Sequence, residues 1–185
     1  MIIGVDIDNV IADTEKELRR IILKRRGLKL TREDITSYSL DNIAGLEREE
    51  LADILDLFNH GDIFLDLEVI DGARETLIML REKHSIVLVT SRPEGVRVKT
   101  ESWLAREDIP YDELHFVSGT KVNGIPYELF LEDQDKFARE LAEDGTYVLL
   151  FDAPWNRHVE HENISRVYNW EDVRKFCFPS CALGH

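Results

Sequence analysis

The chain opens with MIIGVDIDNV (residues 1–10), in which a short apolar run ends at two aspartates. Residues 2–7 fit a strand that is buried on both faces, as the strands of a parallel sheet are. Two more apolar runs of this kind follow, SIVLVT at residues 85–90 and YVLLF at residues 147–151. Helical patterns separate these runs, and strands that alternate with helices indicate an α/β fold with a mainly parallel sheet flanked by helices.

The alternation is interrupted after the first strand, where three helical patterns occur with no strand between them. We therefore expect one core domain made of residues 1–13 and 70–185. Residues 14–69 are expected to form a small helical cap inserted after the first strand, over one edge of the sheet. The helical patterns of the cap region lie at residues 13–26, 31–34 and 46–59. The core should also contain strands at residues 114–117, 129–131 and 166–168 and helices at residues 72–84, 94–106, 134–143 and 170–176.

Composition restricts the class of protein. The 185 residues are 43% hydrophobic, which is typical of one globular core. Acidic residues outnumber basic ones 37 to 23, and a net charge of −14 argues against a nucleic-acid partner. No run approaches the roughly 20 apolar residues that a membrane helix needs, and no signal peptide is recognisable. We therefore expect no membrane partner and a cytoplasmic location, and we leave the oligomeric state open, homo-oligomer included.

The last residues contain a C-x3-C-x3-H pattern, formed by Cys177, Cys181 and His185. One helical face would bring these side chains together as zinc ligands. A frayed chain end is the favoured interpretation, because Pro179 lies within the pattern. The absence of cysteine from the rest of the chain is typical of a protein of the reducing cytosol.

Polar side chains follow the predicted strands where each of them ends. Ligands bind beyond the carboxyl ends of parallel strands, so these side chains should meet at one rim of the sheet. Taken singly, each also fits a turn, a helix cap or a solvated surface position. Their order on successive strand ends indicates a functional site. The candidates are Asp6, Asp8, Thr90, Ser91, Arg92, Lys121, Glu132 and Asp133.

These residues resemble the four motifs of the haloacid dehalogenase-like (HAD) phosphohydrolases. DIDNV (residues 6–10) matches the first motif, the run into Thr90 the second, Lys121 the third, and Glu132-Asp133 the acidic fourth. The resemblance implies a Rossmann-like sheet with a small cap. Within this superfamily the chain looks most like the 5′(3′)-deoxyribonucleotidase group, through DIDNVIADT (residues 6–14), GDIFLDLEVIDGA (residues 61–73), TSRP (residues 90–93) and FDAPWNR (residues 151–157).

The resemblance also implies a chemistry, a Mg²⁺-dependent phosphatase that forms an aspartyl-phosphate. Asp6 would be the nucleophile, and Asp8 would protonate the leaving alcohol and then deprotonate water. Lys121 would balance charge on Asp6 and on the transferring group. The presence of Asp8 favours phosphatase over dehalogenase chemistry. The metal ligands would be Asp6, the Asp8 backbone carbonyl, Asp133 and, through a bound water, Glu132.

The substrate is less closely defined than the reaction. Thr90, Ser91 and Arg92 would bind the phosphate, although Arg92 could also bind the ribose of the substrate, or instead pair with an acid near the rim. A nucleoside monophosphate is the expected substrate; a sugar phosphate or another phosphorylated metabolite is the alternative. A non-catalytic scaffold is disfavoured, because every motif residue is intact. Tyr38, Phe58 and Phe64 could stack a base or simply pack the cap.

Overall fold

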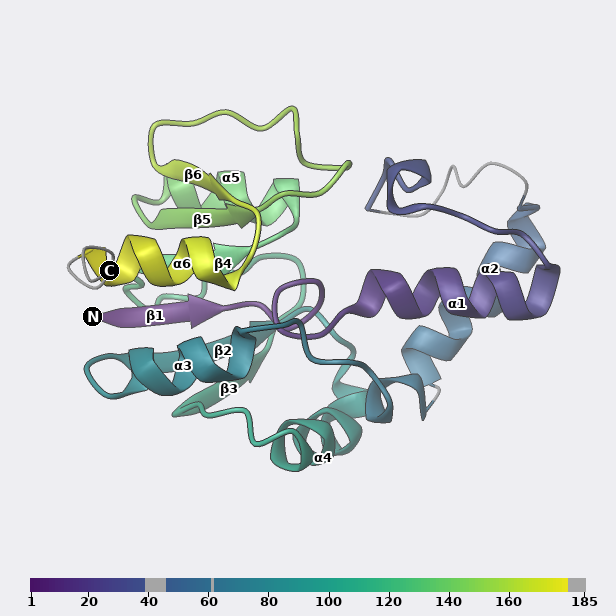
Figure 1. Ribbon diagram of the computed structural model, residues 1–185, viewed down its shortest axis with the longest axis horizontal. Coiled ribbons are helices and arrows are strands. Elements are labelled where there is room, and N and C mark those ends of the chain that lie inside the picture. The colour runs from purple at the N-terminus through teal and green to yellow at the C-terminus, as the bar shows by residue number, and fades with distance from the viewer. Residues whose placement is uncertain (39–45, 61, 180–185) are drawn as a thin grey trace, which may run out of the picture.

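The structure is a computed structural model that describes residues 1–38, 46–60 and 62–179, and a parallel sheet forms its centre (Figure 1). The six strands have the order β3-β2-β1-β4-β5-β6, and every pairing is parallel. The predicted α/β fold is confirmed, as is the Rossmann-like arrangement that the resemblance implied. The strands are β1 (Ile2–Val5), β2 (Ser85–Thr90), β3 (Glu113–Phe116), β4 (Leu129–Glu132), β5 (Tyr147–Phe151) and β6 (Ile164–Val167).

Helices cover both faces of this sheet. On one face, apolar side chains of α3, α4 and α6 pack on one set of alternating strand residues. On the other face, α5 packs on the second set, which includes Val89 and Phe130. The strands therefore contribute to two apolar layers, and the core is buried on both sides of the sheet. The helices are α3 (Ala73–Arg81), α4 (Arg97–Arg106), α5 (Asp135–Glu143) and α6 (Trp170–Cys177).

Element boundaries differ from the sequence prediction by a few residues. The last strand is Ile164–Val167, where residues 166–168 were predicted, because its register is set by pairing with β5 rather than by its own sequence. The segment predicted as a helix at residues 94–106 begins as a 3₁₀ turn, η3 (Glu94–Val96), before α4. Such ends depend on tertiary contacts that local patterns do not contain.

The order of the strands defines a crevice at the carboxyl end of β1. The chain builds β2 and β3 on one side of β1 and then crosses over to place β4, β5 and β6 on the other. This change in the direction of strand addition separates the loops that follow β1 and β4, and ligands of such sheets bind in the gap between these loops. Asp6 follows β1, while Glu132 ends β4 and Asp133 follows it, so the sheet brings the predicted acids to this crevice.

We call residues 14–69 the insertion. It contains α1 (Thr14–Arg26), η1 (Arg32–Asp34), α2 (Arg48–His60) and η2 (Asp62–Leu65). Figure 1 shows α1 and α2 beyond the carboxyl end of β1. Apolar residues of the insertion, such as Leu18, Ile22 and Ile35, form a separate cluster with Trp155 from the loop after β5. Among the described residues, no helix combines the length and the apolar character needed to cross a membrane.

Gly4 of β1 lies where its neighbours leave no room for a side chain. An added Cβ would be 2.2 Å from Cδ2 of Phe130 and 3.0 Å from Cδ1 of Tyr127. The two rings pack edge to face with centroids 5.1 Å apart, and Phe130 is fully buried. We therefore expect Gly4→Ala to lower the free energy of unfolding by about 1–3 kcal/mol, the usual cost of overpacking a core.

Urea unfolding of the wild type and the variant measures this difference. Gly95→Ala is the matched control, because the described residues other than its chain neighbours place no atom within 4 Å of the added Cβ at that position. The control should change the unfolding midpoint little. Equal shifts for the two variants would show that the loss of glycine itself, and not the clash with Phe130, causes the effect.

Candidate active site

The centre of the site is a buried lysine between two carboxylates. Lys121 Nζ lies 2.6 Å from Asp6 Oδ1 and 2.8 Å from Glu132 Oε2. All three side chains are at most 4% exposed. Glu132 is anchored further, because its Oε1 accepts hydrogen bonds from the backbone N–H groups of Asp133 at 3.0 Å and Gln134 at 2.9 Å. The structure thus joins side chains from three separate parts of the sequence.

The electrostatics of this centre are those of crowded acids. Burial raises the pKa of Asp6 to about 7 against the attraction of Lys121, and repulsion from Glu132 and Asp8 contributes. Burial disfavours the charge on Lys121, but attraction to Asp6 and Glu132 outweighs it and raises the lysine pKa. Lys121 therefore stays cationic, while Asp6 ionises only around neutral pH, and a second cation beside it would favour its carboxylate form.

Asp133 has an unused ligand atom beside this centre. Its Oδ2 accepts a hydrogen bond of 3.0 Å from Asn9 Nδ2, whereas its buried Oδ1 has no partner within the described chain. Burial raises the pKa of Asp133 well above its usual range, and repulsion from Glu132 and Asp6 adds to this. One oxygen of each of the three acids lies within 4.8 Å of the others. An all-oxygen, strongly anionic set of this kind fits Mg²⁺.

The backbone of Asp133 is held from the other side by the loop after β5. Its carbonyl oxygen accepts hydrogen bonds from Trp155 Nε1 at 3.0 Å and from Asn156 Nδ2 at 2.7 Å. Asn156 is fully buried and also donates to the Phe151 carbonyl at 2.7 Å. Arg166 Nη1 in turn donates to Asn156 Oδ1 at 2.6 Å. The position of the candidate metal ligand therefore depends on side chains outside the motifs.

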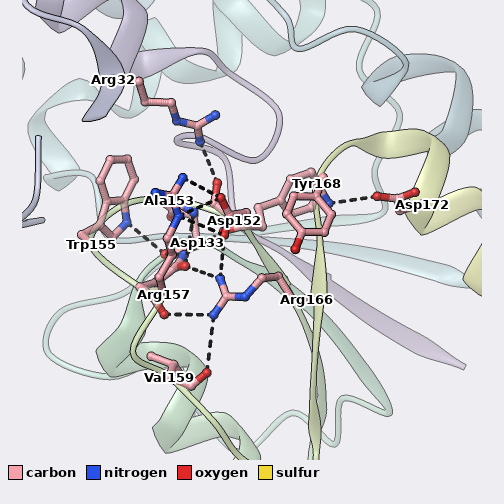
Figure 2. A network of polar contacts seen from close by, with 12 residues as sticks. Arg32, Asp133, Asp152, Ala153, Trp155, Arg157, Val159, Arg166, Tyr168 and Asp172 are labelled. Carbon is pink, nitrogen blue, oxygen red and sulfur yellow. Dashed lines mark hydrogen bonds and ion pairs between the residues drawn. The ribbon is translucent and has the colours of Figure 1, made fainter. Parts of the chain in front are cut away.

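A second set of contacts links this loop to the insertion. Figure 2 shows arginines converging on Asp152. Asp152 Oδ1 lies 3.2 Å from Arg166 Nη1, and Asp152 Oδ2 lies 3.0 Å from Arg157 Nη2. Arg157 also pairs with Glu33 of η1 at 2.7 Å, and Arg32 donates to the Asp152 carbonyl at 2.9 Å. Arg157 and Arg32 therefore tie the loop beside Asp152 to the insertion.

Asp8 has a different environment from Asp6. Arg92 donates to both carboxylate oxygens, from Nη2 to Oδ1 at 2.8 Å and from Nε to Oδ2 at 2.9 Å. Thr14 Oγ1 donates to Oδ1 at 2.5 Å. Burial would raise the pKa of Asp8, but the charge and hydrogen bonds of Arg92, together with Thr14, outweigh burial and hold it below its usual range. Of the two alternatives for Arg92, the structure shows the pairing with an acid.

The remaining phosphate-binding candidates also lie at this rim. Thr90 is fully buried, and its Oγ1 accepts a hydrogen bond of 3.1 Å from the backbone N–H of Arg92. Ser91 is exposed and lines the pocket described next. Ser91 and Asp8 therefore share the lining of one pocket, and Thr90 precedes Ser91 as the last residue of β2.

A cavity of about 270 Å³ opens above these residues, between the strand ends and the insertion. Tyr38 lies in its wall, 6.3 Å from Trp155 between ring centroids in an edge-to-face arrangement. Phe64 also lies in the wall and is 3% exposed. Burial, with the neighbouring acids, raises the pKa of Tyr38 well above its usual range, so its hydroxyl stays protonated. The lining comprises Asp8, Asn9, Thr14, Glu15, Leu18, Ile35, Ser37, Tyr38, Phe64, Ser91, Arg92, Pro93 and Trp155.

Two sequence-based suggestions fall partly on residues outside the description. The side chain of Phe58 lies outside the described residues, so its suggested role in stacking a base is not tested. Cys181 and His185 also lie outside them, so the suggested zinc site is not tested either. Cys177 is half-buried at the end of α6, and burial raises the pKa of its thiol to about 11.

Three side chains of the site were given no role from the sequence. Asn9 donates a hydrogen bond to Asp133, and its backbone is left-handed with a φ of 59°. The sequence around Asn9, which follows two aspartates, does not indicate this conformation. Thr14 reaches Asp8 from the first residue of α1. Trp155 was noted only as part of FDAPWNR, and that motif was the available signal for its contact with the Asp133 carbonyl.

Comparison with known proteins gives a consistent result. The family described as "5′ nucleotidase, deoxy (Pyrimidine), cytosolic type C protein" matches residues 1–181. Nucleotidase CA_C3379 of Clostridium acetobutylicum is 29% identical over 178 residues, which cover 92% of this chain and 90% of that protein.

Solved structures share the fold at lower sequence identity. A HAD family hydrolase of Deinococcus radiodurans R1, with bound phosphate and sodium, is 17% identical with a TM-score of 0.63, and the match covers 95% of this chain and 94% of that one. YfnB of Bacillus subtilis, bound to magnesium, is 10% identical with a TM-score of 0.58, and the match covers 94% of this chain and 96% of that one.

Proposed function

Because the chain belongs to the "5′ nucleotidase, deoxy (Pyrimidine), cytosolic type C" family of phosphoric monoester hydrolases, we propose that it hydrolyses a nucleoside monophosphate through an aspartyl-phosphate on Asp6. One observation carries this proposal: Asp6 lies 2.6 Å from Lys121 at the crevice of the sheet, beside a cavity lined by Asp8 and aromatic rings. A nucleophile, an acid–base group and an aromatic pocket are thereby brought together.

The proposed reaction has two steps. In the first, an Asp6 oxygen bonds to phosphorus while the bond from phosphorus to the leaving oxygen breaks, and the protonated form of Asp8, which the low pKa of this carboxyl makes scarce, gives that oxygen its proton. In the second, water attacks phosphorus, the bond to Asp6 breaks, and Asp8 takes the proton of the water. Lys121 favours the ionised form of Asp6 and would offset charge on the transferring group.

We propose Mg²⁺ as the cofactor, held by Asp6, the backbone carbonyl of Asp8, Asp133 and, through a bound water, Glu132. The partnerless Oδ1 of Asp133 and the magnesium bound to the similarly folded YfnB support this assignment. When bound, the ion would neutralise and orient the substrate phosphate. Thr90 and the Ser91 backbone would bind the phosphate oxygens that face the end of β2.

We further propose that the insertion, residues 14–69, acts as the cap that selects the substrate. The pocket wall above Asp8 is mainly apolar, with Leu18, Ile35 and Tyr38 from the insertion and Trp155 from the core. Flat aromatic and aliphatic surfaces suit a nucleobase, since every base has a π-face to stack. They suit a sugar phosphate less well, because its hydroxyls would lose water without gaining matched hydrogen bonds.

Purified protein with Mg²⁺, assayed against a panel of phosphate monoesters, tests the proposed function. The panel should contain 5′ and 3′ ribo- and deoxyribonucleoside monophosphates, hexose phosphates and p-nitrophenyl phosphate. We expect the highest kcat/KM on a nucleoside monophosphate. Higher kcat/KM on a hexose phosphate would retain the reaction and replace the substrate, whereas no turnover of any ester would refute the proposal.

Tyr38→Ala tests the pocket directly. If a base stacks on this ring, KM for the preferred nucleotide should rise by about 5- to 150-fold, since such stacking contributes about 1–3 kcal/mol. KM for p-nitrophenyl phosphate, which has no base, should change far less. Tyr168→Ala is the matched control, because Tyr168 is 69% exposed and outside the pocket lining. Equal effects of Tyr38→Ala on both substrates would mean that the ring only packs the insertion.

A further inference from the structure

Arg92 is fully engaged with its neighbours at the base of the cavity. Its side chain is 2% exposed, and its Nε and Nη2 form two parallel hydrogen bonds to Asp8 at 2.9 and 2.8 Å. On the opposite side, Nη1 donates to Thr100 Oγ1 of α4 at 3.1 Å. The planar fork that would bind a phosphate in bidentate fashion therefore already binds a carboxylate.

The plane of the guanidinium is also fixed. Its central carbon lies 4.1 Å from the ring centroid of Phe64, at the end of the insertion, and 5.9 Å from that of Trp103 in α4. Both rings are at most 3% exposed. A phosphate ligand would have to displace Asp8 or lift Arg92 off Phe64, and either change would leave a buried charge without its partner.

We propose that Arg92 is a positioning residue, which acts through Asp8 by fixing the orientation of its carboxylate towards the cavity, and not a ligand of the substrate phosphate. This inference rests on the proposed function, in which Asp8 exchanges protons with the leaving group and with water. Asp8 Oδ1 accepts from both Thr14 and Arg92, whereas Oδ2 accepts from Arg92 alone within the described part of the chain and keeps a lone pair for proton transfer.

The fixed orientation matters because proton transfer needs a short contact. Acid and acceptor must approach to about 2.6–3.2 Å, and a displacement of about 1 Å can cost on the order of 100-fold in rate. Arg92→Lys keeps the positive charge but cannot form the two parallel bonds. The variant should therefore retain phosphate binding and lose acid–base function.

The experiment compares kcat/KM of the wild type and Arg92→Lys on two esters at saturating Mg²⁺. Benzyl phosphate has a poor leaving group that requires protonation, and p-nitrophenyl phosphate has a good one that does not. We expect kcat/KM to fall about 100-fold on benzyl phosphate and less than about 5-fold on p-nitrophenyl phosphate. The inhibition constant of inorganic phosphate should change by less than about 2-fold, because no phosphate contact is lost.

A double-mutant cycle that combines Arg92→Lys with Asp8→Asn measures whether the two residues act together on kcat/KM. A merely structural role of Arg92 would not produce such coupling. If Arg92 acts through Asp8, the double variant should have the same kcat/KM on benzyl phosphate as Asp8→Asn alone, within about 3-fold. Arg97→Lys is the matched control, since Arg97 is half-buried and pairs with Glu94, and neither residue lines the cavity. It should leave both esters unaffected.

Three results would overturn the assignment. The first is an active wild type with an Arg92→Lys variant that loses equal activity on both esters. The second is an inhibition constant of phosphate that rises about 10-fold or more in this variant, and the third is additive effects in the double-mutant cycle. Each of these results would make Arg92 a phosphate ligand. If Arg92→Lys does not fold, Thr100→Val loosens the same guanidinium and should give a smaller loss with the same preference for benzyl phosphate. A wild type inactive on both esters would refute the proposed function and this inference with it.

Discussion

Asp6→Asn is expected to abolish phosphatase activity, with a loss of more than about 10⁴-fold, because a nucleophile lost from a covalent mechanism has no substitute. An amide oxygen next to Lys121 carries no full negative charge and does not attack phosphorus. Rapid acid quenching of the reaction with ³²P-labelled substrate should trap a phosphoenzyme in the wild type and none in the variant.

The stability of this variant separates loss of chemistry from loss of fold. Burial already raises the pKa of Asp6 to about 7, so the folded state gains little from its charge. Glu132, 2.8 Å from Lys121, remains as the charged partner of that buried lysine, so the thermal unfolding midpoint of Asp6→Asn should stay close to that of the wild type. Asp66→Asn, the same change at a side chain 80% exposed, should keep full activity. Turnover by Asp6→Asn at even a tenth of the wild-type rate would rule out the covalent mechanism.

The sheet could be predicted from the sequence because its strands are buried on both faces. Runs such as SIVLVT and YVLLF, bounded by charged residues, have few other interpretations in a chain of this size. The order of the strands was not predictable in the same way. That β1 lies between β2 and β4 depends on which apolar layers match across the whole sheet, which no local pattern records.

The same distinction between local patterns and long-range contacts applies to the candidate site. Asp6 and Asp8 could be located because they follow a recognisable strand, and the carboxyl ends of parallel strands share one rim. The partners of these acids could not be assigned from the sequence, since the contact of Arg92 with Asp8 joins residues that are 84 positions apart. The contact of Arg157 with Glu33, which links the loop after β5 to the insertion, joins residues that are 124 positions apart. For Arg92 the sequence left two roles open, and only the packing of Phe64 and Thr100 around it distinguishes them.

Mg²⁺ should stabilise the folded protein as well as support turnover. At a Mg²⁺ concentration about 100 times its Kd, binding to the folded state alone adds about 2.7 kcal/mol, which for a chain of this length raises the thermal midpoint by about 5–10 °C. The reason is the cluster itself, because among the described residues Lys121 is the only cation paired with its three carboxylates, Asp6, Glu132 and Asp133. Exhaustive chelation should abolish hydrolysis, and Mg²⁺ should restore it.

Two matched substitutions in this cluster should behave in opposite ways. Asp133→Asn removes a carboxylate whose pKa burial holds well above its usual range, so the metal-free protein should be at least as stable as the wild type while the shift caused by Mg²⁺ disappears. Glu132→Gln should instead destabilise the metal-free protein, because Lys121 loses a charged partner at 2.8 Å inside the core. Calorimetric scans of each variant with and without Mg²⁺ make the comparison. If the fully chelated wild type kept its activity and Mg²⁺ left its midpoint unchanged, the acids would be a structural cluster, and Asp133 Oδ1 would need another explanation.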